Sequence, residues 1–197
     1  MIATLKTRWR TTRINASQAL RGGMLAAALL VVILLVSFRA CAPSPTAARQ
    51  HINRPAIAFA LPAEQAGALL PAPVAVTPAS GKPTLLTFFY TLCTHCLLEM
   101  RTAHGVAAQF PGLRSVYIDS PAERPNVTDL MMQRLAITDP VLLDDDGKVA
   151  ARYGVSYYPS FVLIDAHGVV RDIWTGEVDA ATLHAGIARA LATSEGG

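Results

Sequence analysis

The chain has 197 residues, enough for one well-buried domain and a tail but too few for two large cores. Its hydrophobic fraction of 52% is high for a soluble protein and points to a local apolar segment. The net charge of +3 is also local, because the first 23 residues hold five basic residues and no acidic ones, leaving 12 basic against 14 acidic residues beyond them. This balance excludes nucleic-acid binding as the reason for the basic charge.

A basic tail at residues 1–21 is followed by an apolar run at residues 22–38 that contains no charged residue. As a helix, this run reaches roughly 25 Å, the short end of what spans a bilayer. Because basic tails stay in the cytoplasm, we expect a single-pass signal anchor in the cytoplasmic (inner) membrane, with the rest of the chain in the periplasm or outside the cell. The alternatives are a signal peptide cleaved near Ala40-Cys41-Ala42 and a lipoprotein site at Cys41.

A linker and a short β-structure are predicted next. Residues 39–54 are rich in Ala and Pro and lack apolar periodicity, as is typical of an extended linker, so we expect the folded domain at residues 55–197. Its first segments, Ala56–Leu61 and Val74–Thr77, are short and apolar and are interrupted by Pro and Gly. They predict an N-terminal β-hairpin ahead of the main sheet.

The main domain begins with a strand and a helix. The run Thr84–Tyr90 is nearly all apolar, which predicts a strand buried on both faces. From Cys93 to Phe110 apolar residues recur at three- and four-residue steps, and Pro111-Gly112 ends the pattern, which predicts a helix that begins at the cysteines. Strands and helices then alternate, at Ser115–Asp119, Val127–Leu135, Val141–Leu143, Gly147–Tyr153, Ser160–Asp165, Val169–Trp174 and Ala180–Leu191. This order predicts an α/β fold with a central mixed sheet flanked by helices.

Two cysteines separated by two residues at a strand-to-helix junction are the arrangement of a redox-active disulfide. Cys93 would lie at the helix N-terminus, where free N–H groups and the helix dipole stabilise an anion, so we predict that it is the attacking thiolate. Cys96, one turn further, would be shielded and would resolve the mixed disulfide with a partner. Between them lie Thr94 and His95, and the His95 imidazole can stabilise the Cys93 thiolate, with a neutral exposed residue as the alternative.

Other roles for the cysteine pair are weaker. A zinc site would need a second ligand pair, and the remaining histidines are scattered along the chain. A Cu(I)-binding chaperone using Cys93 and Cys96 as soft ligands and a redox-inactive interaction module remain alternatives. We therefore expect no metal and no cofactor beyond the Cys93–Cys96 disulfide.

The segment around the cysteines reads TLLTFFYTLCTHCLLEM, and a later one reads PVLLDDDGKVAARYGVSYYPSFVLIDAHGVVRDIWTGEV. Together they resemble the extracytoplasmic thioredoxins of the TlpA/ResA type, relatives of the cytochrome c maturation reductases. The resemblance implies a thioredoxin fold and thiol:disulfide oxidoreductase activity. It also implies that Pro159 is a cis-proline facing the cysteines and that the backbone of Tyr158 is free to pair with substrate. Glu99 matches a glutamate buried near the disulfide that passes protons to or from Cys96, with a solvated carboxylate as the alternative.

The chain departs from this family pattern at three positions. Leu92 replaces the usual tryptophan before the first cysteine, Arg101 stands where proline is common, and Tyr158 is bulkier than the usual residue. With these differences in view, we expect a membrane-anchored reductase of disulfides in specific exported proteins, such as apocytochromes or metal-centre assembly factors, supplied with electrons by a membrane thiol donor. A thiol oxidase or isomerase is the alternative that His95 favours.

Overall fold

The computed structural model describes residues 29–31, 49–121 and 125–194. The chain divides into two compact units, Met1–Pro43 and Ser44–Gly197. In the first unit, residues 29–31 form an exposed helical turn, and the rest of the predicted tail and span, residues 1–38, lies outside the described residues. Within the described ranges, no helix combines the length and hydropathy needed to cross a membrane.

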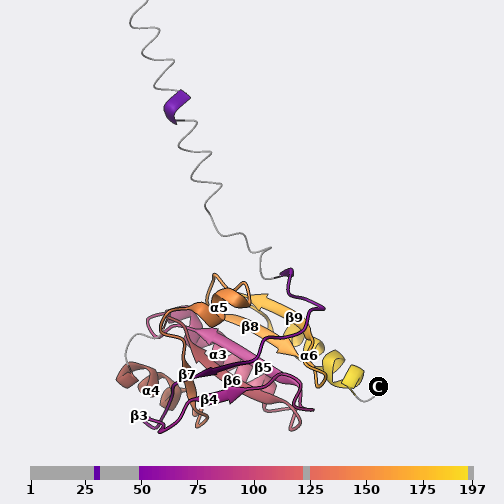
Figure 1. Ribbon diagram of the computed structural model, residues 1–197, viewed down its shortest axis with the longest axis horizontal. Helices are drawn as coiled ribbons and strands as arrows, with labels where there is room; N and C mark the ends of the chain where they lie inside the picture. Colours follow the sequence, from indigo (N-terminus) through magenta and orange to yellow (C-terminus); the bar gives the residue numbers. More distant parts are fainter. Residues whose placement is uncertain (1–28, 32–48, 122–124, 195–197) are drawn as a thin grey trace, which may run out of the picture. The chain divides into compact units, whose positions relative to one another are not determined.

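The second unit is built on a seven-stranded mixed sheet with the order β3-β2-β7-β6-β5-β8-β9 (Figure 1). β5 pairs in parallel with β6 and antiparallel with β8, so it lies inside the sheet. All six residues of β5 are buried, as predicted for this run, because both faces of the sheet are covered. The strands are β2 Ala63–Gln65, β3 Ala68–Leu69, β5 Thr84–Phe89, β6 Arg114–Asp119, β7 Val141–Leu143, β8 Ser160–Ile164 and β9 Val170–Thr175.

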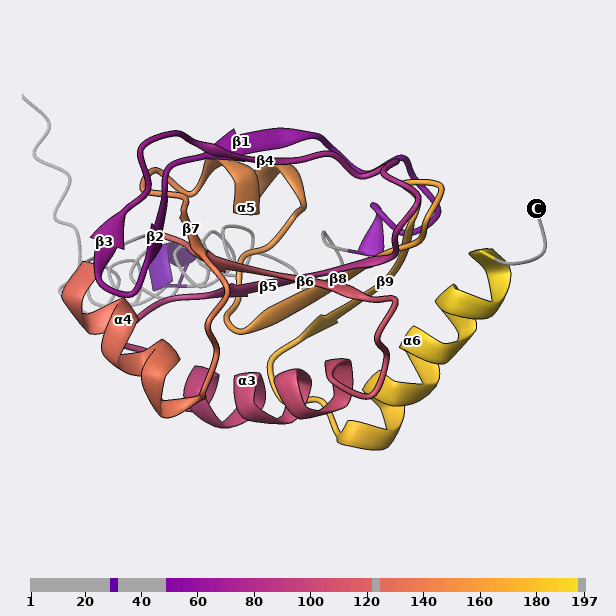
Figure 2. The same ribbon diagram turned by 90° about the horizontal axis from the view of Figure 1, so that it is seen from below.

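Helices cover both faces of the sheet. Figure 2 shows α3, α4 and α6 on one side and α5, with β1 and β4, on the other. The bounds are α3 Thr94–Ala107, α4 Pro125–Arg134, α5 Lys148–Arg152 and α6 Ala180–Ser194. This arrangement confirms the predicted α/β fold, and every predicted strand and helix from residue 84 onward is present within a few residues.

The N-terminal β-structure is more elaborate than the predicted hairpin. β1, Phe59–Leu61, and β4, Val74–Val76, do pair antiparallel. Between them, however, the chain forms the hairpin β2–β3, which joins the edge of the main sheet antiparallel to β7. Its turn residues Ala66 and Gly67 have φ of 51° and 76°, as in a type I′ turn. The hairpin has no clear sequence signal, because its strands are very short and Ala replaces the usual Asn or Asp.

The residues just before the predicted domain start lie along β9. The N–H of Asn53 donates to the carbonyl of Val170 (2.7 Å), and the N–H of Val170 donates to the carbonyl of Arg54 (2.9 Å). A third bond joins the N–H of Ala56 to the carbonyl of Gly168 (2.8 Å). Asn53 and Arg54, the last two residues of the predicted linker, are therefore bonded to the first residue of the edge strand.

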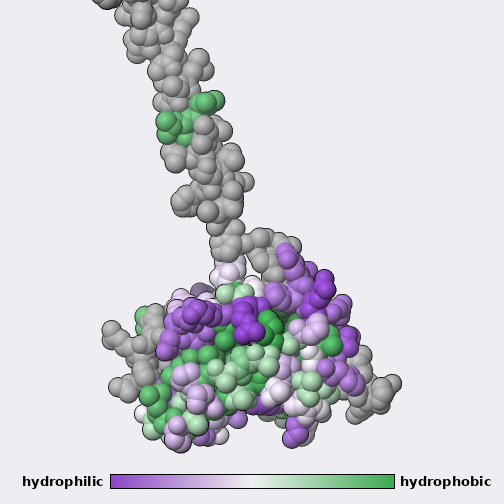
Figure 3. All heavy atoms as spheres, viewed as in Figure 1, coloured by the Kyte–Doolittle hydropathy of each residue, from purple (hydrophilic) through white to green (hydrophobic). Residues whose placement is uncertain are grey.

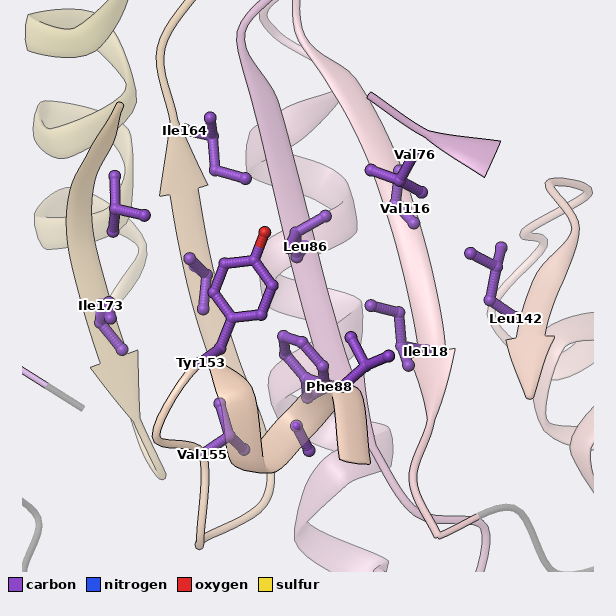
Figure 4. Packing of buried hydrophobic residues seen from close by; sticks show 14 of the residues in the cluster. Val76, Leu86, Phe88, Val116, Ile118, Leu142, Tyr153, Val155, Ile164 and Ile173 are labelled. Atoms are coloured by element: carbon purple, nitrogen blue, oxygen red, sulfur yellow. The ribbon is translucent and has the colours of Figure 1, made fainter. Parts of the chain in front are cut away.

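Buried hydrophobic clusters hold the layers together. Figure 4 shows the ring of Tyr153, the residue after α5, lying over Leu86 and Phe88 of β5. The Tyr153 hydroxyl donates to the carbonyl of Ile57 (2.8 Å) and accepts from its N–H (3.0 Å), which fixes the start of the domain to the core. The surface of the second unit that faces the viewer in Figure 3 is hydrophobic in its middle and hydrophilic along its upper edge.

Candidate active site

Cys93 and Cys96 form a disulfide at the start of α3. The loop after β5 delivers Cys93 to the N-cap position, where its sulfur accepts a hydrogen bond from the N–H of Cys96 (3.0 Å). Cys93 exposes 9% of its surface, whereas Cys96 is fully buried against Met100 and other hydrophobic residues. A partner can therefore reach Cys93 first, and an anion at Cys93 would face the free N–H groups of the helix end.

The two residues between the cysteines face solvent. The side chains of Thr94 and His95 are exposed. Among the described residues, His95 has no hydrogen-bond partner through its ring, so the imidazole is free to turn toward an approaching partner. This geometry is compatible with both predicted roles of His95, the tuning of the thiolate and the neutral one.

Tyr158 and Pro159 lie next to the start of β8. The Tyr158–Pro159 peptide bond is cis, as the family resemblance implied. The Tyr158 ring packs edge-on against Tyr90, with ring centroids 5.6 Å apart, and contacts the hydrophobic cluster that contains both cysteines. A second cis bond, Ser120–Pro121, follows β6 and was not predicted.

Glu99 is buried on α3, one turn after Cys96. Its Oε2 accepts a hydrogen bond from the N–H of Val178 in the segment between β9 and α6 (3.2 Å). Burial agrees with the expectation drawn from the family, and the solvated alternative is wrong. The contact also gives Glu99 a structural partner, so its proton-transfer role stays a prediction.

Two further buried carboxylates, Asp119 beside the active-site loop and Glu64 on β2, belong to no sequence motif. Asp119, at the end of β6, is fully buried, and its Oδ2 accepts hydrogen bonds from the hydroxyls of Thr91 and Thr128 (2.7 Å each). Glu64 on β2 exposes 2% of its surface, and neither of its carboxylate oxygens has a hydrogen-bond donor in the described part of the chain. Burial, followed by the charges of Asp119 and Asp129, raises the pKa of Glu64 to about 7.

These carboxylates were hard to find from sequence. Asp119 could have been found, because it ends β6, and the carboxyl ends of neighbouring parallel strands lie at the same edge of a sheet. Since β5 ends just before the cysteines, the end of β6 is expected beside them. Glu64 lies on the unpredicted β2–β3 hairpin, and only the tertiary structure brings it near Asp119. No pattern along the chain marks it.

A cavity of about 250 Å³ opens beside Cys93, between the active-site loop, α3 and α4. Four hydrophobic residues line it, namely Leu92, Leu97, Leu130 and Met131. Its polar lining consists of Thr91, Thr94 and Arg134. In the described residues, no group of three or more His, Cys, Asp or Glu side chains is arranged to hold a metal ion.

The geometry and the sequence agree with one known family. The AhpC/TSA family model matches residues 52–173. The chain belongs to the AhpC/TSA family. This membership, together with the relatives described next, confirms the predicted resemblance to thioredoxin-like proteins of the ResA type.

Curated relatives of this AhpC/TSA family chain include two thioredoxin-like proteins. It is 30% identical over 103 residues to the thiol-disulfide oxidoreductase ResA of Geobacillus thermodenitrificans, covering 51% of this chain and 59% of that protein. It is 29% identical over 101 residues to the thioredoxin-like protein YneN of Bacillus subtilis, covering 50% of this chain and 59% of that protein. The matches therefore span less than two thirds of the relatives' own lengths.

Solved structures share the fold. A secreted Mycobacterium tuberculosis disulfide oxidoreductase is 25% identical and superposes with a TM-score of 0.55, covering 66% of this chain and 95% of that one. The thioredoxin-like architecture predicted for the folded domain is thus confirmed.

Proposed function

We propose that this protein is a membrane-anchored thiol:disulfide oxidoreductase that reduces disulfides in specific exported proteins. The observation that carries the proposal is the unequal exposure of two disulfide-bonded cysteines at the start of α3, with Cys93 reachable at the N-cap and Cys96 buried behind it. The ResA-type relatives support the same chemistry.

The reduced enzyme would act in two exchange steps. The Cys93 thiolate attacks one sulfur of the partner disulfide, forming a Cys93–partner disulfide and releasing the other partner sulfur as a thiolate. Cys96 then loses its proton and attacks the Cys93 sulfur, forming the Cys93–Cys96 disulfide and releasing the second partner sulfur, which takes up a proton. A membrane thiol donor supplies the two electrons that restore the dithiol.

Nearby residues would assist these steps. Buried Glu99 would take the proton that Cys96 releases, and His95 would stabilise the Cys93 thiolate. Tyr158, whose ring contacts the cysteine-containing cluster, would offer its backbone to the partner chain, with the cis peptide at Pro159 shaping that loop.

The direction of electron flow is tested by the redox equilibrium of the full chain in detergent against a glutathione series, followed by thiol trapping. A potential near roughly −270 mV, the value for thioredoxin, is the expected result for a reductase. A value near roughly −120 mV would overturn the reductase assignment and favour the oxidase alternative, with His95 as its cause. Cys96→Ser should accumulate the Cys93 mixed disulfide, whereas Cys93→Ser should not.

The membrane anchor at residues 22–38 forms part of the proposal. Its charge-free apolar run and the basic tail at residues 1–21 support a single span with the catalytic domain, residues 55–197, outside the cytoplasm on a linker at residues 39–54. Alkaline extraction of membranes tests it. Retention of a chain with an intact N-terminal tag is expected, and release of a shortened chain would show signal-peptide cleavage instead.

A further inference from the structure

The cavity beside Cys93 lies between two hydrophobic walls. Leu92 and Leu97 come from the active-site loop and α3, and Leu130 and Met131 come from α4. Leu92 is 67% exposed and Leu130 is 50% exposed. Paired exposed leucines that flank a reactive sulfur are typical of a surface that a partner covers, because covering them removes apolar area from water.

The position of Cys93 lets a partner approach it through this cavity. Cys93 lines the cavity, so a partner sulfur that reaches it from this side lies between the two walls. The residues beside the partner's cysteine are therefore brought against Leu92 and Leu130. The substrate is a protein segment whose neighbouring side chains decide the fit.

The described residues that line the cavity carry one fixed charge, which is positive. Among them, Arg134, the last residue of α4, is the sole ionisable residue apart from Cys93. It lies one turn after Leu130, so both project from the same side of the helix. The Arg134 side chain is exposed and forms no ion pair within the described residues.

The described acidic residues nearest to Arg134 in the chain lie outside the cavity, and one of them, Asp139, lines the cavities beside β2 and β6 instead. Asp129 accepts a hydrogen bond from Gln133 (2.7 Å) and lines a separate cavity beside β2 and β3. Asp119 is fully buried and bonded to Thr91 and Thr128. No Asp or Glu is among the described residues that line the cavity, so we look to the partner for a carboxylate that pairs with Arg134 there.

We propose that this cavity selects partner segments in which the reactive cysteine is flanked by an apolar residue and an acidic residue. The inference rests on the proposed thiol:disulfide exchange at Cys93 and specifies its substrate class. The apolar residue packs between Leu92 and Leu130, and the acidic side chain pairs with Arg134. Charge complementarity at the rim of a hydrophobic site acts mainly on partner choice and encounter rate.

The test uses the reduced full chain in detergent and three symmetric disulfide probes of the form (acetyl-Leu-Cys-X-amide)₂, with X as Glu, Gln or Lys. The rate of probe reduction is divided by the rate at which free 2-mercaptoethanol reduces the same probe, which removes intrinsic reactivity. We expect the Glu probe to react about threefold faster than the Lys probe, within the range of a solvent-accessible ion pair. Added salt should reduce this ratio.

Charge reversal gives the decisive comparison. Arg134→Glu should invert the order of the Glu and Lys probes, and Arg134→Gln should remove the difference. Arg152→Glu on α5, an exposed residue on the other side of the sheet, is the matched control and should leave the order unchanged. A fourth probe with Asn in place of Leu should react more slowly with all variants.

Each other outcome is informative. An unchanged order in Arg134→Glu, or an equal change in Arg152→Glu, would overturn the selective role of Arg134 while leaving the exchange chemistry intact. Equal rates for the Leu and Asn probes would remove the apolar half of the proposal. If the reduced chain reduces none of the probes faster than 2-mercaptoethanol does, the proposed function itself fails.

Discussion

The buried environment of Glu64 makes the stability of the folded state depend on pH. Its pKa of about 7 lies above the ordinary 4.5, so the folded state holds the proton more tightly than the unfolded state. The resulting stability is complete below pH 4.5 and is lost as the pH rises through about 7. Between pH 4.5 and about 7, ionisation of Glu64 should lower the free energy of unfolding of the parent by about 1.4 kcal/mol per pH unit. We predict that Glu64→Gln lacks this decrease and is therefore more stable than the parent at pH 8.

Urea unfolding at several pH values checks this prediction through the difference between variant and parent. Carboxylates other than Asp119 and Asp129, whose charges act on Glu64, titrate alike in both proteins, so their contributions cancel in that difference. Glu177→Gln, an exposed change, is the matched control and should leave the slope unaltered. Parallel stability curves for Glu64→Gln and its parent would show that Glu64 is ionised in the folded protein at neutral pH.

The packing of α6 on β9 depends on a glycine. A Cβ added at buried Gly186 would overlap the Trp174 indole, lying 2.7 Å from Cη2 and closer still to Cζ2. The rigid indole cannot move without disturbing the cluster it packs against. We predict that Gly186→Ala lowers the free energy of unfolding by about 1 to 3 kcal/mol, although alanine is the better helix former.

Gly105 in α3 is the matched control at the scale of a helix. It is exposed, and a Cβ there meets nothing within 4 Å, so Gly105→Ala should stabilise the protein by about 0.5 to 1 kcal/mol. Denaturant unfolding of both variants measures the change in the free energy of unfolding, which should be negative for Gly186→Ala and positive for Gly105→Ala. Stabilisation by both changes would mean that α6 can shift away from β9 at little cost.

The elements also show which features a sequence can predict. Long periodic segments such as β5 and α3 were predicted because burial of one or both faces leaves a pattern in the chain. The β2–β3 hairpin has strands of two and three residues, too short for such a pattern. The cysteine pair was recognisable from its spacing. The proximity of Glu64 to Asp119 depends on the strand order β2-β7-β6, which local sequence does not encode.

At the scale of the whole molecule, the residues before Ile57 are bonded to the beginning of one edge of the sheet. β9 is the edge strand, and its first residue, Val170, exchanges two backbone hydrogen bonds with Asn53 and Arg54, while a third bond joins Ala56 to Gly168 in the turn before β9. A fragment starting at Ile57 loses these bonds, whereas one starting at Arg49 keeps them. At about 1 kcal/mol for each bond, we predict that the shorter fragment is less stable by about 2 to 3 kcal/mol.

The shorter fragment should also associate more readily, because the N–H and C=O of Val170 and the C=O of Gly168 become free to pair with another chain. Urea unfolding compares the stabilities of the two fragments, and sedimentation at rising concentration compares their association. With an acetylated N-terminus, the shorter fragment keeps the amide N–H and the carbonyl of Ile57 that bond Tyr153, so any difference reports on the edge of β9 and not on the core. Equal unfolding midpoints and equal sedimentation would show that the segment from Arg49 to Ala56 lies against β9 without stabilising it, and that the domain's stability begins at Ile57.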